Sequence, residues 1–259
     1  MGTTPQIWIS LRGGLGNQIF QYIFGQYLIQ IGFNVVGYVP EYEGETFSRS
    51  LLVDKIAKIP LKLFDFSYLD GGLIVDSENL KSITDFIQTS DHSKMLLRGY
   101  WQSVDLLQKI DSTALFNIDN FSNPLCAVHV RRLDYGHHGH LAISYYAAAL
   151  EKLGWPSFVV YTDEPNFSKY FFSKYNNFKG IITPNLINPL SNFVSLSNHV
   201  NLIIANSSFS LLAAYFSFAK HHGKVCFPVE WSLIPGVIVS GIDALTGWHK
   251  IQTTLISPL

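Results

Sequence analysis

The second half of the sequence alternates short apolar runs with helical segments, and this alternation constrains the fold more than any other feature. The runs are rich in β-branched residues, as strands buried on both faces of a sheet are. Alternating strands and helices of this kind predict a parallel, doubly wound sheet, which binds ligands at the carboxyl ends of its strands. The expected strands span residues 125–130, 158–162, 180–183, 200–205 and 225–228, and the expected helices span 144–153, 166–175, 190–198 and 208–220.

The first half opens with a strand, a glycine-rich turn, a helix that ends at Gly32 and a second strand, which together predict a β-α-β unit. Residues 40–94 are harder to interpret, with helices expected near 51–58 and 78–88. A strand over 95–101 and a helix over 102–110 follow. A polar stretch at 119–124 ends in proline, which indicates a domain boundary. The expected domains are therefore 1–122 and 123–259.

Composition narrows the class of protein. Of the 259 residues, 47% are apolar and 14% charged, which is not the composition of a disordered chain. The formal net charge is −1, so the basic excess expected of a general nucleic-acid binder is missing. Both cysteines lie in apolar runs and are expected in the core. The sequence shows neither a signal peptide nor a membrane-spanning segment, so the expected location is cytoplasmic, with work at the inner membrane face as an option.

The glycine-rich turn, residues 12–18, follows a strand and opens a helix. Free backbone amides at such a helix start favour binding of an anion or a sugar. Gly14 and Gly16 match the first two glycines of the dinucleotide fingerprint, but Ile19 occupies the third position. A plain strand-to-helix turn is the structural alternative.

The run HVRRLD at residues 129–134 ends a predicted strand. In a strand, His129 and Arg131 point to the same side and Arg132 to the other. Arginine suits a diphosphate because its guanidinium is planar and always charged. We therefore interpret Arg131 as a diphosphate ligand, with a structural salt bridge as the alternative, while Arg132 is expected to pair with Asp134 or another carboxylate.

Two further strand ends carry polar residues. Asn206 or Ser207 is a good N-cap, and the amides that follow, at Ser208 and Phe209, would offer a second seat for phosphate. Helix capping alone is the alternative there. Asp163 ends another strand, where it would contact a guanine ring or a ribose, or cap the next helix.

The spacing of the acidic residues argues against a metal site. No two of the twelve aspartates are spaced i, i+2, the arrangement expected of a site that holds a diphosphate through a divalent ion. No metal is therefore expected. The histidine loop, with His137, His138 and His140, is interpreted as solvated. The acidic residues Glu41, Glu43 and Glu45 are interpreted as solvated too, with a general base among them as the alternative.

Together these motifs resemble glycosyltransferase family 11, the α-1,2-fucosyltransferases. The family's GG-L-GNQ-F-QY motif corresponds to GGLGNQIFQY at residues 13–22. Its H-x-RR-x-D motif corresponds to HVRRLD at 129–134, and its I-I-A-N-S-S-F-S-W-W-A-A motif to IIANSSFSLLAA at 203–214. GYWQS at 99–103 and SYY at 144–146 are lesser matches. The three main motifs occur in the family's order across almost the whole chain.

The resemblance implies a GT-B-like α/β fold, with two Rossmann-like parallel-sheet domains facing a cleft. It implies an inverting, metal-independent transfer of L-fucose from GDP-fucose to the 2-hydroxyl of a galactose-type glycan acceptor, in glycan or polysaccharide synthesis. Arg131 would stabilise the leaving diphosphate, and His129 would line the same pocket. Asp163 would lie near the nucleoside, residues 206–210 would seat ribose or phosphate, and Gly14, Gly16 and Asn17 would contribute from the other, acceptor-side domain.

Two departures from the family pattern leave alternatives open. Leu133 stands where the family often has glycine, and Leu211 and Leu212 stand where it has Trp-Trp. If they line the pocket, the donor could be another GDP-linked deoxyhexose. A non-catalytic nucleotide- or glycan-binding protein is a further alternative, and a metal-dependent hydrolase using the histidine loop is a weaker one.

Overall fold

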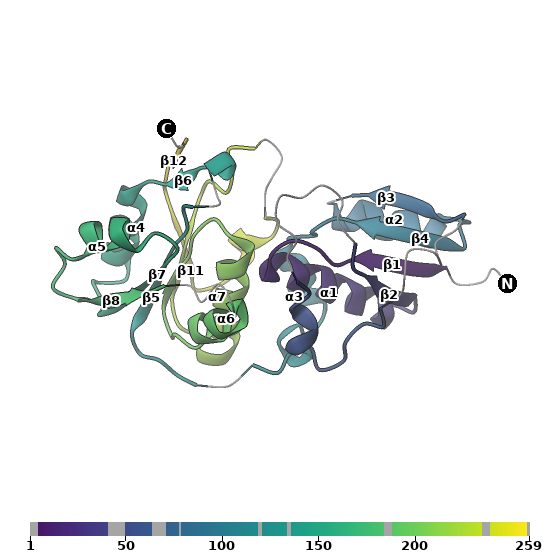
Figure 1. Cartoon of the computed structure of the whole chain (residues 1–259), viewed down its shortest axis with the longest axis horizontal. Helices are drawn as coiled ribbons and strands as arrows, with labels where there is room; N and C mark the ends of the chain where they lie inside the picture. The colour runs from purple at the N-terminus through teal and green to yellow at the C-terminus, as the bar shows by residue number, and fades with distance from the viewer. Residues whose placement is uncertain are drawn as a thin grey trace. The chain divides into compact units, whose positions relative to one another are not determined.

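The chain divides into two units, Met1–Asn117 and Ile118–Leu259 (Figure 1). The computed structural model describes residues 5–40, 50–63, 71–77, 79–118, 121–133, 136–183, 188–234 and 239–257. The division lies between Asn117 and Ile118, close to the boundary expected between residues 122 and 123. Within the described ranges, no helix is both long and apolar enough to cross a membrane.

Unit 1 is built on a parallel sheet with the strand order β2-β1-β4-β3. β1 is in the middle of the sheet, and its residues Ile7 and Ile9 are fully buried. The elements are β1 (Gln6–Ser10), α1 (Leu15–Gln30), β2 (Asn34–Tyr38), the 3-10 turn η1 (Val53–Lys55), β3 (Leu73–Asp76), α2 (Leu80–Thr89), β4 (Lys94–Arg98), α3 (Val104–Lys109) and the 3-10 turn η3 (Thr113–Leu115).

Unit 1 differs from the sequence-based expectation at two places. The helix expected over 51–58 is wrong, because only the 3-10 turn η1 forms there. The next backbone groups bond instead to a distant segment: Lys58 N donates to Leu115 O, and Asn117 N donates to Ile56 O. These tertiary hydrogen bonds replace the i→i−4 bonds that would extend a helix. β3 was not expected, since its four residues form an edge strand whose side chains are only partly buried.

Unit 2 contains a six-stranded parallel sheet with the order β11-β10-β9-β5-β7-β8. When the six strands of this sheet are numbered in chain order, they lie in the order 3-2-1-4-5-6, the order of dinucleotide-binding folds. The elements are β5 (Cys126–Val130), η4 (Gly136–His138), β6 (His140–Leu141), α4 (Ile143–Lys152), β7 (Phe158–Thr162), α5 (Pro165–Phe172), β8 (Phe178–Ile182), α6 (Pro189–Ser197), β9 (Leu202–Ile203), α7 (Ser208–His221), β10 (Val225–Pro228), η5 (Ile242–Ala244), β11 (Trp248–Ile251) and β12 (Leu255–Ile256).

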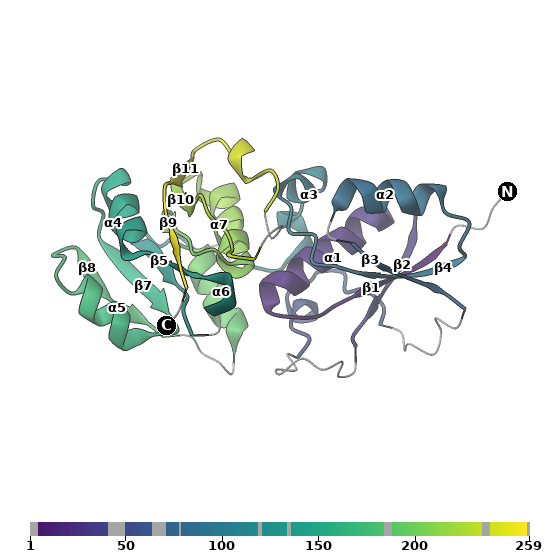
Figure 2. The same cartoon turned by 90° about the horizontal axis from the view of Figure 1, so that it is seen from above.

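Helices cover both faces of this sheet. α4 and α5 lie on one face, and α6 and α7 lie on the other, as Figures 1 and 2 show. Such a doubly covered sheet has apolar strands throughout, which is why the alternation was readable from the sequence. β6, β11 and β12 were not expected. β6 and β12 pair antiparallel and form a small separate sheet.

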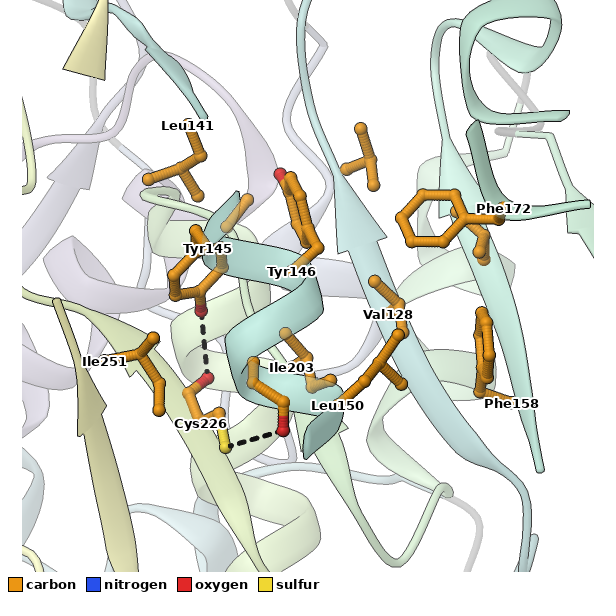
Figure 3. Packing of buried hydrophobic residues seen from close by; sticks show 14 of the residues in the cluster. Val128, Leu141, Tyr145, Tyr146, Leu150, Phe158, Phe172, Ile203, Cys226 and Ile251 are labelled. Atoms are coloured by element: carbon orange, nitrogen blue, oxygen red, sulfur yellow. Dashed lines mark hydrogen bonds between the residues drawn. The ribbon is translucent and has the colours of Figure 1, made fainter. Parts of the chain in front are cut away.

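The main core of unit 2 lies between the sheet and α4 and α5 (Figure 3). Tyr145 is fully buried there, and its hydroxyl donates to Ile204 O at 2.6 Å, with Cys226 O at 3.3 Å. This hydroxyl therefore ties α4 to the neighbouring strands β9 and β10. Cys126 and Cys226 are free and buried, which confirms their expected place in the core. Burial raises the pKa of Cys226 to about 12, so its thiol stays protonated at neutral pH.

A buried polar network around His199 joins the start of β5 to β7 and α6. His199 lies just before β9; its Nδ1 is 2.8 Å from Leu125 O, and its Nε2 is 2.9 Å from the hydroxyl of Tyr161. That hydroxyl also contacts Ser195 Oγ at 2.6 Å. If Nδ1 carries the proton and donates to the carbonyl, Nε2 accepts from Tyr161, so the network suits a neutral imidazole. Burial accordingly lowers the pKa of His199.

We predict that His199 makes unit 2 less stable in mild acid. The unfolded chain takes up a proton near the ordinary histidine pKa of about 6.5, whereas folded His199 resists protonation until a lower pH. The free energy of unfolding should therefore fall as the pH drops below about 6.5. Urea unfolding at pH 7.5, 6.5 and 5.5 measures this.

The matched variants are His199→Gln and, at an exposed position, His92→Gln. His199→Gln should flatten part of the pH dependence, while His92→Gln should keep the wild-type slope. Equal slopes for wild type and His199→Gln would contradict the assignment.

Candidate functional site

The winding of unit 2 changes direction between β5 and β9. From β5 the chain runs through β7 to β8, and it then returns to β9 on the other side of β5 before continuing to β10. At such a point the two strands lead away in opposite directions and leave their carboxyl ends open to a ligand. Arg131 follows β5, and residues 204–207 follow β9.

Arg131 and Ser207 meet at this switch point. Arg131 Nη1 donates to Ser207 Oγ at 3.1 Å. The guanidinium is half-buried, as a group positioned for a ligand at the end of a strand would be. The structure therefore brings the HVRRLD motif and the ANSSFS motif, 76 residues apart, into direct contact.

The start of α7 lies at the same point. Ser207, one of the two N-caps expected from the sequence, is the N-cap of α7, but its side chain makes no hydrogen bond to the helix amides. Its hydroxyl is used by Arg131 instead. The first turn, with half-buried Ser208 and Phe209, thus keeps the positive end of the helix dipole beside a guanidinium. This pair of features attracts an anion.

His129 and Arg132 take opposite sides of the strand end. The ring of His129 lies 5.9 Å from that of Phe209, centroid to centroid, on the side of α7. Arg132 turns toward α5, where its Nε donates to Glu164 Oε2 at 2.6 Å and its guanidinium carbon lies 3.9 Å above the Phe167 ring. The carboxylate partner of Arg132 is thus Glu164, while Asp134 lies outside the described residues.

Asp163 holds the loop after β5 in place. Its carboxylate accepts from the backbone amides of Arg132, at 2.9 Å, and Leu133, at 3.2 Å. These bonds fix the segment that begins at Arg131. Asp163 does not cap α5, because the N-cap of that helix is Glu164. Its observed contacts position the segment that carries Arg131.

Asn206 is also a positioning residue. Its side chain is fully buried, and Nδ2 donates to Gly139 O at 3.2 Å and to Trp231 O at 3.0 Å. One amide thereby joins the loops that follow β5 and β10 to the end of β9. Its Oδ1 is buried with no hydrogen-bond partner among the described residues, and the expected contact of Asn206 with a donor stays a prediction.

Two residues of the histidine loop, His138 and His140, make hydrogen-bonding contacts within the protein. His140 is buried and its Nε2 lies 2.7 Å from Arg132 O, while His138 Nδ1 lies 2.9 Å from Ser232 Oγ. The expectation of a solvated loop is therefore wrong for His140, because β6 and β12 pair and enclose it. In the part of the chain that the structure describes, no three His, Cys, Asp or Glu side chains come together in a group that could hold a metal ion.

The two departures from the family pattern have different surroundings. Leu211 and Leu212 are both 0% exposed and pack inside unit 2, so they do not line a surface. Leu133 is 72% exposed and follows the arginine pair directly. Leu133 is therefore the departure that a bound ligand could meet.

Unit 1 carries a second group of polar residues at the ends of β1 and β4. Gly14 is the N-cap of α1, Gly16 is buried in its first turn, and Asn17 Oδ1 accepts from Gln102 Nε2 at 2.9 Å. Gly13 has φ +76°, and a Cβ there would lie 2.9 Å from Asn17 Nδ2. The tight turn thus needs glycine at position 13.

Two glutamines of α1 hold these loops, and sequence reasoning missed both. Gln21 accepts from Arg12 N at 2.9 Å and donates to Gly99 O at 3.0 Å, so one side chain joins the loops after β1 and β4. Gln18 accepts from Leu52 N at 2.8 Å. The signal in the sequence was their position among the apolar residues of the helix, because buried polar side chains require hydrogen-bond partners. Glu41, Glu43 and Glu45 lie outside the described residues.

No protein-family model matches the chain, and no curated protein matches it. Several solved structures do match the chain. The α-1,6-fucosyltransferase NodZ, co-crystallised with GDP, is 13% identical, with a TM-score of 0.52 over 82% of this chain and 92% of NodZ. A structure of NodZ from Bradyrhizobium is 12% identical, with a TM-score of 0.51 over 82% of this chain and 93% of NodZ.

Two other proteins have the same fold. FUT1 from Arabidopsis thaliana, in complex with GDP, is 12% identical, with a TM-score of 0.53 over 88% of this chain and 70% of FUT1. The E. coli heptosyltransferase WaaC, with ADP, is 9% identical, with a TM-score of 0.51 over 95% and 93%. At these identities the likeness concerns the fold. The chain has the α/β GT-B fold, which confirms the fold class expected from the sequence.

We predict that Asn206→Ala destabilises unit 2 and loosens both loops. The carbonyls of Gly139 and Trp231 would lose a buried donor, at a cost of about 2–4 kcal/mol for the two. Asn176, which is exposed in the same unit, offers the matched control Asn176→Ala. Urea unfolding measures the difference, and equal stability of the two variants would contradict the role given to Asn206.

Proposed function

We propose that this chain is a fucosyltransferase that moves L-fucose from GDP-fucose to a sugar hydroxyl. The single observation that carries the proposal is the contact of Arg131 with Ser207 at the start of α7. It joins two of the three motifs that resemble family 11 at the point where parallel sheets bind nucleotides. The GT-B fold supports it further, because NodZ and FUT1, which have this fold, were solved with GDP.

In this proposal Arg131 binds the diphosphate of the donor and stabilises it as the leaving group. The guanidinium fork can donate two parallel hydrogen bonds to phosphate oxygens. The first amides of α7, at Ser208 and Phe209, would add donors and the helix dipole. Such preorganised donors act on charge that develops in the transition state, which is where they accelerate a reaction. This arrangement would neutralise the leaving group without a metal ion.

The remaining residues have supporting roles. His129 would line the donor pocket beside Phe209, the ring that its imidazole faces. Asp163 and Asn206 would hold the loops that carry Arg131 and enclose the donor, which is the role their backbone contacts support. We propose unit 1 as the acceptor side, with Gly14, Gly16 and Asn17 near the reacting groups.

The linkage and the stereochemistry are finer parts of the proposal. The three motifs support an inverting α-1,2 transfer to a galactose-type acceptor, while NodZ is an α-1,6-fucosyltransferase. Digestion of the product with linkage-specific fucosidases distinguishes the two linkages, and the anomeric configuration of the product tests inversion.

A second candidate is the same reaction with another GDP-linked deoxyhexose. The exposed side chain of Leu133, beside the arginine pair, favours it, because an apolar side chain there would meet the donor sugar. WaaC has this fold and was solved with ADP, so the fold itself does not fix the donor. A panel of GDP-sugars assayed with the same acceptors separates the two candidates.

We predict that Arg131→Ala lowers turnover at least about 100-fold, because a preorganised donor to the leaving group is lost. GDP release from GDP-fucose, with a panel of galactose-terminated acceptors and EDTA present, measures this. Arg98→Ala is the matched control, since Arg98 binds Asp76 on the surface of unit 1 and should leave turnover unchanged.

Release that needs an acceptor, persists in EDTA and collapses only in Arg131→Ala is the expected result. If the wild type released GDP without EDTA but not with it, the result would contradict the metal-independent mechanism. GDP binding without release from any GDP-sugar would leave a binding protein as the function.

A further inference from the structure

Arg12 is a guanidinium without a carboxylate partner among the described residues. Arg98 makes two hydrogen bonds to Asp76, and Arg132 is paired with Glu164. The guanidinium of Arg12 lies over the ring of Tyr100, 5.4 Å from the guanidinium carbon to the ring centroid. Stacking on an aromatic ring stabilises a cation but does not neutralise its charge.

The side chain of Arg12 is also partly desolvated. Its Nε is buried and has no hydrogen-bond partner in the described part of the chain. A buried N–H without an acceptor costs free energy, so such a group in a native protein calls for an explanation. Arg12 is thus held in a place that costs stability, at the end of the central strand β1.

The surrounding structure fixes Arg12 and Tyr100 relative to each other. Gln21 binds the backbone amide of Arg12 and the carbonyl of Gly99, the residue before Tyr100. Beyond Tyr100 the chain turns sharply at buried Trp101, whose φ of +47° lies in the left-handed region. A bulky residue rarely adopts this conformation, and strain of this kind concentrates at functional sites.

Asn17 and Gln102, two described residues near this turn, add hydrogen-bond donors and acceptors but carry no charge. Asn17 and Gln102 are joined side chain to side chain beside the same turn. The first turn of α1 contains no acidic residue, and Gly14 provides no side-chain cap. The positive end of the α1 dipole therefore adds to the charge of Arg12.

We propose that Arg12, held on Tyr100, binds an anionic group of the acceptor glycan, a carboxylate or a phosphate on a sugar of that glycan. This inference rests on the proposed function, because it assigns the acceptor class for the site in unit 1. Arginine is the residue suited to both groups, since its planar fork matches two oxygen atoms at once. Amide side chains such as Asn17 and Gln102 then suit the sugar hydroxyls.

The test compares three galactose-terminated oligosaccharides of equal length: one neutral, one with a uronic acid and one with a phosphate monoester. Binding is measured by calorimetry and turnover by GDP release. The wild-type protein should bind at least one acidic acceptor about tenfold or more tightly than the neutral one, and this preference should shrink as salt is raised. The arm that shows the preference identifies the anion as carboxylate or phosphate.

Variants assign the preference to Arg12. Arg12→Gln should remove the preference for the acidic acceptor, and Arg12→Lys should keep part of it because the charge remains. Arg98→Gln, which removes an arginine already bound to a carboxylate, should keep the full preference. Thermal melting checks that each variant is folded.

Equal affinity of wild type for neutral and acidic acceptors would overturn the inference, and so would a preference that Arg12→Gln retains. These results are distinct from failure of the proposed function, which would appear as no turnover of any acceptor. Calorimetry still tests the subsite in that case, because binding of the acidic saccharide does not require transfer.

Discussion

Reversal of the winding direction between β5 and β9 is the constraint on which the rest of unit 2 depends. Parallel strands joined by right-handed crossovers can extend a sheet in one direction only, so adding strands on both sides of β5 requires the chain to return across the sheet. The return leaves the carboxyl ends of β5 and β9 side by side. Arg131 and Ser207 stand at those two ends, and their contact follows from the topology.

Side-chain hydrogen bonds to backbone groups then give the loops their shape. Asp163 binds the amides that follow Arg131, Asn206 binds Gly139 and Trp231, and Gln21 joins the loops after β1 and β4 in unit 1. These side chains give hydrogen-bond partners to backbone groups that would otherwise remain unpaired in the loops. In both units, side-chain hydrogen bonds thus fix loops at strand ends, where α/β proteins bind ligands.

The sequence predicted those parts that depend on local pattern. The apolar strands β7 and β10, the helix α7 and the opposite directions of Arg131 and Arg132 all follow from periodicity, and the structure has them. Contacts between distant segments were not predictable in this way. The 51–58 segment bonds to residues 115–117 rather than forming a helix, and His140 is enclosed by the pairing of β6 with β12. The partners of Asn206 likewise lie 67 and 25 residues away.

We propose that the start of α7 and the loop after β5 bind the nucleotide diphosphate. Hydrogen–deuterium exchange with and without saturating GDP tests it most directly, because it reads the backbone amides themselves. We expect slower exchange at residues 208–210 and 131–133 when GDP is bound. Unchanged exchange at both segments, with GDP binding shown by calorimetry and protection elsewhere in the chain, would contradict it.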